Sequence, residues 1–205
     1  MYIPLNTLKQ HDFPDALDFD FRRFKLSDRK WYEPFAAKFS PVSCEYNFAN
    51  LFAWQEPCQF SWAMFQGRVL VLEEFSGICL MPLGPEMEPA ALAALLQQLN
   101  QAGRAPSGLI ASADYPERFP ETEAFFDITQ RRDLSEYLYD TSHLVDLTGT
   151  RLHKKRNLIS QFRRANENYK IESLNDLVRQ QALDLSRAML ERFDPPAVTL
   201  EQEYQ

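Results

Sequence analysis

The chain has 205 residues, of which 45% are hydrophobic and 13% aromatic, and its formal net charge at pH 7 is −7. This is the composition of a globular protein, and the length suits one full domain or one domain with part of a second. The acidic balance excludes general adhesion of the whole chain to nucleic acid or to an anionic membrane. Any such contact requires a local basic patch.

Cysteine usage and hydropathy bear on the compartment. Three cysteines lie far apart in the sequence and form no C-x-x-C pair, which argues against a metal site or a disulfide framework. The N-terminal residues lack the cationic and apolar regions of a signal peptide, and no stretch approaches the roughly 18–20 apolar residues of a membrane span. We therefore expect a cytoplasmic protein without a transmembrane segment or a bound metal.

The first predicted elements are a short strand at 21–26 and a helix that Ser27 would cap. Pro34 falls inside this helix and is expected to break or kink it. A second helix at 44–54 would place its apolar side chains on one face: Phe48, Leu51 and Phe52.

From residue 59 the pattern changes to runs rich in aromatic and β-branched residues. The runs 59–65 and 68–73 are joined by Gln66-Gly67, a two-residue hairpin signal. Ser76-Gly77 then turns the chain into a third run at 78–82. We predict three antiparallel strands.

An Ala/Leu-rich helix is predicted at 88–102, with Pro89 near its start and Gly103 just past its end. It is followed by a buried strand at 109–112, a helix at 117–126, and strands at 137–139 and 144–147. This order predicts the α+β class, with a mixed, mostly antiparallel sheet flanked by helices.

A second unit is predicted after Leu147. It comprises a helix at 150–166, a strand at 169–173 and a helix at 175–193 with Asn175 as its N-cap. Two helices and one strand are too few to close a sheet. We therefore expect a complete first domain at 1–148 and the truncated start of a second at 149–205.

The helix at 150–166 is the most basic part of the chain. Residues 151–170 hold seven cations and one acid, a net charge of +6, which leaves −13 for the rest of a chain whose total is −7. Cations in the first turn of a helix oppose its dipole at a cost of a few tenths to about 1 kcal/mol each, and a phosphate would relieve that cost. We predict an anion-binding site formed by Arg151, Lys154, Lys155, Arg156, Asn157 and Arg163.

On a helical wheel, the apolar residues of this helix share one sector: Leu152, Leu158, Ile159, Phe162 and Ala165. Arg156 and Arg163 lie at its border. Lys155 falls within the sector, and its stem is expected to pack while its ammonium group reaches water. The alternative to an anion site is that the basic side chains only reach water or pair with nearby acids.

Catalytic residues are not indicated by any motif. The sequence has no G-x-G-x-x-G or Walker A loop, and the proline-rich, acidic stretch 82–89 would repel a pyrophosphate. The three histidines stand near no Ser-Asp or Cys arrangement of recognisable spacing: His11, His143 and His153. Of these, only His153 adjoins the basic turn, where it could act as an acid or a base.

Two segments resemble a known bacterial family. SCEYNFANLFAW at 43–54 and LHKKRNLISQF at 152–162, together with the approach at 137–140, are similar to proteins related to the C-terminal domain of phosphatidylglycerol lysyltransferase. The similarity extends from about residue 20 to residue 195. It implies two tandem GNAT-like (N-acyltransferase-like) domains, and acyl or aminoacyl transfer from an aminoacyl-tRNA or an acyl-coenzyme A as donor substrate.

The resemblance also brings out two departures from the family pattern. The stretch 82–89 stands where a GNAT-like domain would cradle a coenzyme pyrophosphate, so the first domain is expected to have a degenerate donor site. The second domain ends before its own equivalent loop, so the fragment by itself is expected to lack activity. Two alternatives stay open: a non-catalytic module that binds an anionic lipid headgroup or RNA, and a structural protein whose cations pair with its own acids.

Overall fold

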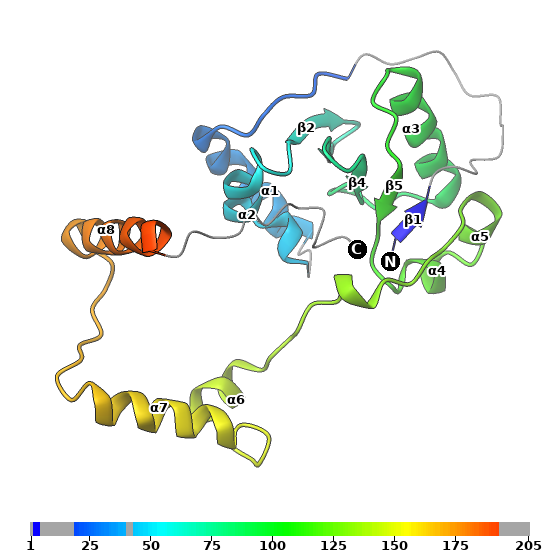
Figure 1. The fold of residues 1–205 in the computed structure, drawn as a ribbon. Helices are drawn as coiled ribbons and strands as arrows, with labels where there is room; N and C mark the ends of the chain where they lie inside the picture. Colours follow the sequence, from blue (N-terminus) through cyan, green and yellow to red (C-terminus); the bar gives the residue numbers. More distant parts are fainter. Residues whose placement is uncertain (1, 5–18, 40–42, 193–205) are drawn as a thin grey trace. The chain divides into compact units, whose positions relative to one another are not determined.

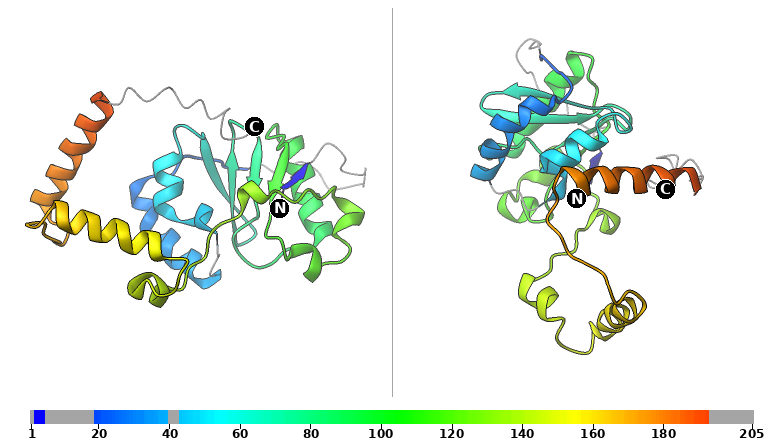
Figure 2. Two further views of the ribbon diagram at one scale, coloured as in Figure 1. Left: turned by 60° about the horizontal axis from the view of Figure 1, so that its bottom comes forward. Right: turned by 90° about the vertical axis from the view of Figure 1, so that its left-hand side faces the viewer.

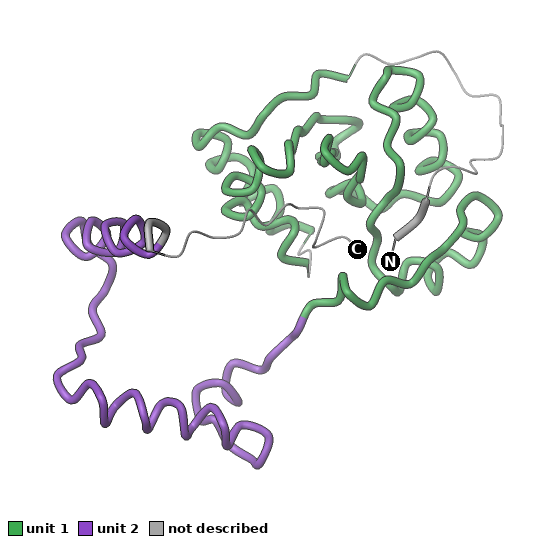
Figure 3. The backbone as a smooth tube through the Cα atoms, viewed as in Figure 1, with its two compact units in different colours: residues 1–136 green, residues 137–205 purple. Residues whose placement is uncertain are grey.

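The computed structural model describes residues 2–4, 19–39 and 43–192 (Figure 1). The chain divides into two compact units, residues 1–136 and residues 137–205 (Figure 3). Unit 1 holds the sheet, and the described part of unit 2 consists of three helices with their connections.

Five strands of the described residues form one mixed sheet in the order β1-β5-β4-β3-β2. Neighbouring strands pair antiparallel except β4 and β5, which are parallel. The predicted three-stranded meander and the α+β class are confirmed. The strands are β1 (Tyr2–Pro4), β2 (Phe60–Phe65), β3 (Arg68–Glu73), β4 (Ile78–Leu80) and β5 (Gly108–Ile110).

The turn between β2 and β3 explains the register of this hairpin. Gln66 and Gly67 both have positive φ, 47° and 75°, as a two-residue hairpin turn with the twist of the strands requires. Phe65 therefore pairs with Arg68 and Phe60 with Glu73. Because successive side chains of a strand point to opposite faces, this register fixes which side chains lie on each face of the sheet.

One face of the sheet is covered by α3 (Pro89–Gln101), the crossover that makes β4 and β5 parallel (Figure 2). Pro89 occupies its first turn, and Gly103 follows its end with a φ of 74°. Its leucines recur at helical spacing and are at most 1% exposed: Leu92, Leu95, Leu96 and Leu99. Burying each contributes about 2 kcal/mol, so this helix anchors the main core.

The other face carries an aromatic layer from α1 (Arg29–Phe39) and α2 (Phe48–Trp54). Trp62 of β2 is 2% exposed and lies 4.7 Å from Trp31 and 5.7 Å from Phe24, centroid to centroid. Tyr32, fully buried, packs on Phe24. Such ring pairs add to the area that they bury, and they fix both helices to the sheet.

The start of unit 1 differs from the prediction. No strand forms at 21–26: Arg22 makes an isolated bridge to Trp62, and a 3-10 helix, η1 (Leu26–Asp28), follows. Ser27 lies inside η1, and Asp28 accepts the backbone N–H of Lys25 instead. The helix that follows continues through Pro34 to Phe39, so the predicted break is wrong. Packing of its aromatic residues outweighs the one hydrogen bond that proline removes.

The remaining elements of unit 1 are short. The predicted helix at 44–54 is confirmed apart from its first turn, η2 (Cys44–Tyr46), which is a 3-10 helix. The helix predicted at 117–126 is two helices, α4 (Tyr115–Arg118) and α5 (Thr122–Phe125). Pro120 separates them, because the residue before a proline disfavours helical backbone. A further 3-10 helix is η3 (Arg132–Leu134).

Unit 2 contains α6 (Thr141–Asp146), α7 (His153–Ala165) and α8 (Asp176–Arg192). The helices predicted at 150–166 and 175–193 are therefore confirmed within a few residues, although residue 193 lies outside the described part. The strands predicted at 137–139, 144–147 and 169–173 are wrong. Residues 144–146 are helical because the Asp140 carboxylate caps α6 at the backbone N–H of Ser142. The other two segments have no strand partner among the described residues.

Candidate anion-binding site

The predicted site residues lie on α7 and in the turn before it. The helix begins at His153, so Arg151 belongs to the turn rather than to the helix. Five of the six predicted side chains are exposed, whereas Arg156 is half-buried. The structure therefore places the predicted cations on α7 and the turn before it, and Arg156 alone among them is half-buried.

The first turn of α7 concentrates positive charge without an internal counter-charge. It contains no acidic residue, and Leu152, the N-cap, makes no side-chain cap hydrogen bond. Lys154, Lys155 and Arg156 thus add to the partial positive charge that the helix dipole places at this end. Within the described part of unit 2, none of these cations forms an ion pair with a carboxylate. An external anion would be stabilised here by both contributions.

Arg156 has a structural role that the sequence pattern did not reveal. Its Nη1 donates to the carbonyl of Leu147 and, at 2.8 Å, to that of Gly149. Leu147 and Gly149 have φ values of 51° and 83°, so the chain turns sharply between α6 and α7. Arg156 holds this turn in place and so positions the residues that precede the helix.

The cations extend along the helix rather than around one point. Lys154 and Arg163 are nine residues apart, which places their Cα atoms about 14 Å apart along the axis and on opposite sides of the helix. A single phosphate contacts only one of these two cations. A ligand that contacts both must carry several phosphates and reach two sides of the helix.

The loop at 82–89 in unit 1 is held by its own protein contacts. Arg68 donates from Nε to the Pro85 carbonyl at 2.7 Å and from Nη2 to the Glu86 carbonyl at 3.1 Å. The hydroxyl of Tyr115, a side chain that is 1% exposed, donates to the Met87 carbonyl at 2.8 Å. These loop carbonyls face donors of the protein, and a phosphate needs donors rather than acceptors.

The first family-like segment, 43–54, also has structural contacts. Glu136 accepts hydrogen bonds from the Ser43 hydroxyl at 2.7 Å and from the Cys44 backbone N–H at 2.8 Å. The Tyr46 hydroxyl donates to the Met81 carbonyl at 2.8 Å, and burial raises its pKa. Partial burial and the neighbouring Glu136 raise the pKa of the Cys44 thiol. Cys44 therefore lacks the lowered pKa of a nucleophilic cysteine.

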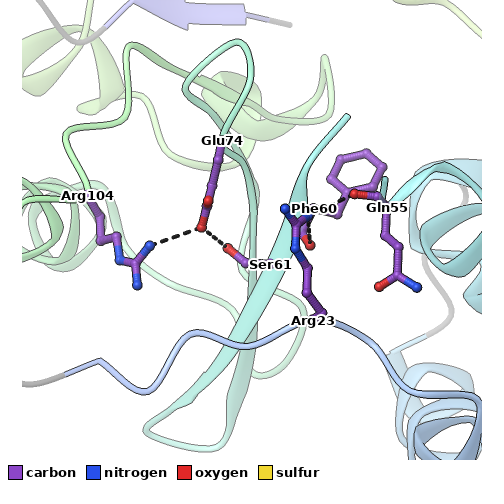
Figure 4. Close-up of polar contacts among 6 residues, drawn as sticks. All are labelled: Arg23, Gln55, Phe60, Ser61, Glu74 and Arg104. Carbon is purple, nitrogen blue, oxygen red and sulfur yellow. Dashed lines mark hydrogen bonds and ion pairs between the residues drawn. The ribbon is translucent and has the colours of Figure 1, made fainter. Parts of the chain in front are cut away.

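Polar side chains near the edge of the sheet join separate segments of unit 1 (Figure 4). Arg23 Nη1 donates to the carbonyls of Gln55 and Phe60, at 2.8 Å each, and so ties the N-terminal segment to α2 and β2. Glu74 Oε1 accepts from the Ser61 hydroxyl at 2.7 Å and from Arg104 Nη1 at 3.0 Å. Each of these hydrogen bonds joins two segments of unit 1 and so has a structural role.

One buried acid escaped the sequence reasoning. Glu73 is 4% exposed; its Oε2 accepts from the Ser76 hydroxyl at 2.6 Å. Its Oε1 and the Oε1 of Gln55 are buried without a hydrogen-bond partner among the described residues. A charged residue at a strand end ordinarily indicates an exposed position, so no pattern could have identified this one.

The described residues offer little for other kinds of site. No three His, Cys, Asp or Glu side chains gather there in a way that could hold a metal ion. His11 lies outside the described residues, and His143 and His153 are both exposed. No described helix combines the length and apolar character that crossing a membrane requires.

Comparisons with known proteins identify relatives. Residues 36–198 match the family described as phosphatidylglycerol lysyltransferase, C-terminal. A crystal structure of a conserved protein of unknown function from Bacteroides thetaiotaomicron shares the fold, with a TM-score of 0.71 at 23% identity. The similarity covers 91% of this chain but 64% of that one, so the chain spans less than two thirds of its structural relative. No curated protein matches the sequence.

Proposed function

Because the chain belongs to the phosphatidylglycerol lysyltransferase C-terminal family, we propose that it is part of an acyl- or aminoacyltransferase whose helix α7 binds the phosphates of the donor. The donor is an aminoacyl-tRNA or an acyl-coenzyme A. The observation that carries the proposal is the cationic first turn of α7, which lacks both an acidic residue and a side-chain cap. That turn lies within the matched region.

The charge distribution along α7 supports a donor with several phosphates. A tRNA backbone or a coenzyme with its pyrophosphate presents phosphates at intervals, and the cations from Lys154 to Arg163 span about 14 Å along the axis and lie on two sides of the helix. Arg151, Lys154 and Lys155 would contact phosphates at the start of the helix. The Asn157 amide and Arg163 would contact them further along.

Arg156 would act as a positioning residue in this arrangement. Its guanidinium donates to two carbonyls of the turn between α6 and α7. Arg151 is carried by that same turn, so loss of Arg156 would displace a phosphate ligand. Its effect on donor binding would therefore be indirect.

We place the donor on unit 2 because of the contacts in unit 1. The order β2-β3-β4-α3-β5, with β4 and β5 parallel, supports a GNAT-like first domain. Its loop at 82–89, however, presents carbonyls that Arg68 and Tyr115 occupy, together with acidic side chains. A degenerate donor site in the first domain would account for the occupied carbonyls of this loop. A second domain that starts near α7 would account for the cations of that helix.

The test measures binding of the 205-residue chain to tRNA and to an acyl-coenzyme A across a salt series. Lys154→Gln with Lys155→Gln should weaken binding and lower the salt slope by about 0.7–0.9 for each phosphate that the variant no longer neutralises. The matched control is Lys30→Gln with Lys38→Gln, which removes two exposed cations from α1. Unchanged affinity for both donors, or an equal reduction in the control, would contradict the proposal.

A further inference from the structure

Two aromatic side chains of unit 2 are exposed to water just before α6. Tyr137 and Tyr139 are 86% and 62% exposed, the highest values among the large exposed aromatic side chains of the described residues. Their rings are nearly parallel, at 20°, with centroids 6.3 Å apart. We call these two side chains the tyrosine pair. Two such rings together form a larger exposed surface than the isolated apolar side chains that are ordinary on proteins.

The geometry of the tyrosine pair suits a flat ligand. Parallel rings present their faces, and both rings are largely open to solvent. The rings of Phe162 and Tyr169 on the same unit differ, since they meet at 67° with centroids 5.4 Å apart and the edge of one covers the face of the other. Proteins hold unpaired nucleobases by stacking them on open aromatic faces, because every base has a flat face of its own.

Hydrogen bonds connect the tyrosine pair to the cationic turn of α7. Asp140, the residue after Tyr139, accepts from the backbone N–H of Ser142 at 2.8 Å and from its hydroxyl at 2.5 Å, and so fixes the start of α6. This helix has six residues and is about 9 Å long. At its end, the Leu147 carbonyl accepts from Arg156 of α7. The rings and the cations therefore belong to one connected part of unit 2.

The charges around the two features are opposite. Glu136 and Asp140 flank the tyrosine pair in the sequence, and they repel a phosphate from it. Lys154 and Lys155 attract a phosphate to the first turn of α7, which has no acidic residue. A ligand that uses both features must place an uncharged flat group at the rings and an anionic group at α7. A nucleotide has this chemistry.

We propose that the tyrosine pair is a stacking platform for the adenine base of the donor, whose phosphates α7 binds. This inference rests on the proposed function and deepens it, because a tRNA and a coenzyme A both contain adenine. A protein strand laid on residues 137–139 would also cover the rings, but it would leave the cations of α7 without an anion. A nucleotide satisfies the rings and the cations together.

The experiment compares two short RNA strands of equal length in their binding to the 205-residue chain. One strand carries a single adenine among abasic positions, and the other is fully abasic, so their phosphates are the same. The wild type should bind the adenine strand about 5- to 150-fold more tightly, the range for stacking of one base. Tyr137→Leu with Tyr139→Leu should abolish this difference and leave the salt slope unchanged. Both side chains are exposed, so the variant should keep its fold, which circular dichroism will verify.

A spectroscopic readout distinguishes the two sources of adenine. The strand is prepared with 2-aminopurine in place of adenine, and coenzyme A with etheno-adenine, since stacking on an aromatic ring quenches the fluorescence of both analogues. The wild type should quench at least one of them, which identifies the source, and the tyrosine variant should quench neither. The matched control is Phe162→Leu with Tyr169→Leu, which removes the edge-on pair of the same unit and should quench like the wild type.

Failure of this inference and failure of the proposed function give different results. Equal affinity of the wild type for the two strands, quenching that the tyrosine variant retains, or quenching lost in the control instead would overturn the stacking platform. If Lys154→Gln with Lys155→Gln still weakened the binding of both strands, phosphate binding by α7 would stand. Binding that depended on the tyrosines but not on the lysines would support the stacking platform and contradict phosphate binding by α7.

Discussion

Gly84 lies in the loop between β4 and α3, where a glycine could serve either a ligand or the packing of the chain. Its φ is 155°, which side-chain-bearing residues rarely adopt. A Cβ built at this position would lie 2.7 Å from Arg68 Cγ, 3.0 Å from Arg68 Cα and 3.0 Å from the Gly67 carbonyl oxygen. The close neighbour is therefore the β2–β3 hairpin, and we predict that Gly84→Ala destabilises unit 1.

The expected loss of stability depends on which atoms could move to relieve the contact with the new Cβ. Arg68 Cγ would have to shift, yet the guanidinium of Arg68 is hydrogen-bonded to the carbonyls of Gln66, Pro85 and Glu86. Breaking one such charged hydrogen bond costs about 1.5–3 kcal/mol, and overpacking costs about 1–3 kcal/mol. Since relief of the clash weakens the hydrogen bond, these costs overlap, and we expect a total of about 2–4 kcal/mol.

The assay is chemical denaturation followed by tryptophan fluorescence, with Gly103→Ala as the matched control. Gly103 also has a positive φ, 74°, but a Cβ there would meet no atom within 4 Å. The control should be destabilised by only about 1–2 kcal/mol, from the left-handed backbone. A Gly84→Ala variant as stable as the control would refute the steric argument. If the folded variant bound the donor more weakly, the loop would instead be part of the donor site.

Three further outcomes are expected. Tyr46→Phe removes the partly buried hydrogen bond to the Met81 carbonyl and should cost about 1–2 kcal/mol in the free energy of unfolding, measured by denaturant titration. For Glu136, partial burial would raise the pKa, but hydrogen bonds from Ser43 and Cys44 outweigh it and lower the pKa below its usual 4.5. A group with a lowered folded pKa stabilises at higher pH, so the stability advantage of wild type over Glu136→Gln should be full at neutral pH and shrink as pH falls below about 4.5; a pH-independent difference would contradict this. Arg156→Lys should speed amide exchange in residues 147–153 about tenfold, because lysine cannot hold both carbonyls of the turn, whereas unchanged exchange would show that the turn forms without it.

Elements with a local signal were predictable from the sequence. The hairpin at Gln66-Gly67 formed as expected because two residues with positive φ satisfy the twist of a tight turn. The helix at 89–101 followed from its leucine spacing and from the proline and glycine at its ends. The same holds for α7, whose charge pattern is a property of its own residues. These features depend on neighbours within a few positions.

Elements that need a distant partner were predicted less well: the strand at 109–112 formed as β5 (Gly108–Ile110), but other predicted strands did not form. Residues 137–139 and 169–173 have the composition of strands, yet a strand requires hydrogen bonds to another strand, and none pairs with them among the described residues. Burial of Tyr32 at the sheet carried α1 past Pro34, against the local preference.

For the candidate site, the sequence by itself determined which residues are basic and that they gather on one helix. Only the tertiary structure decided what each cation does. Arg156 is committed to two carbonyls because the chain turns back at Leu147 and Gly149. Lys154 and Lys155 are exposed, and no carboxylate in the described part of unit 2 pairs with them. The composition of a segment sets its charge, but the path of the backbone sets which polar groups it meets.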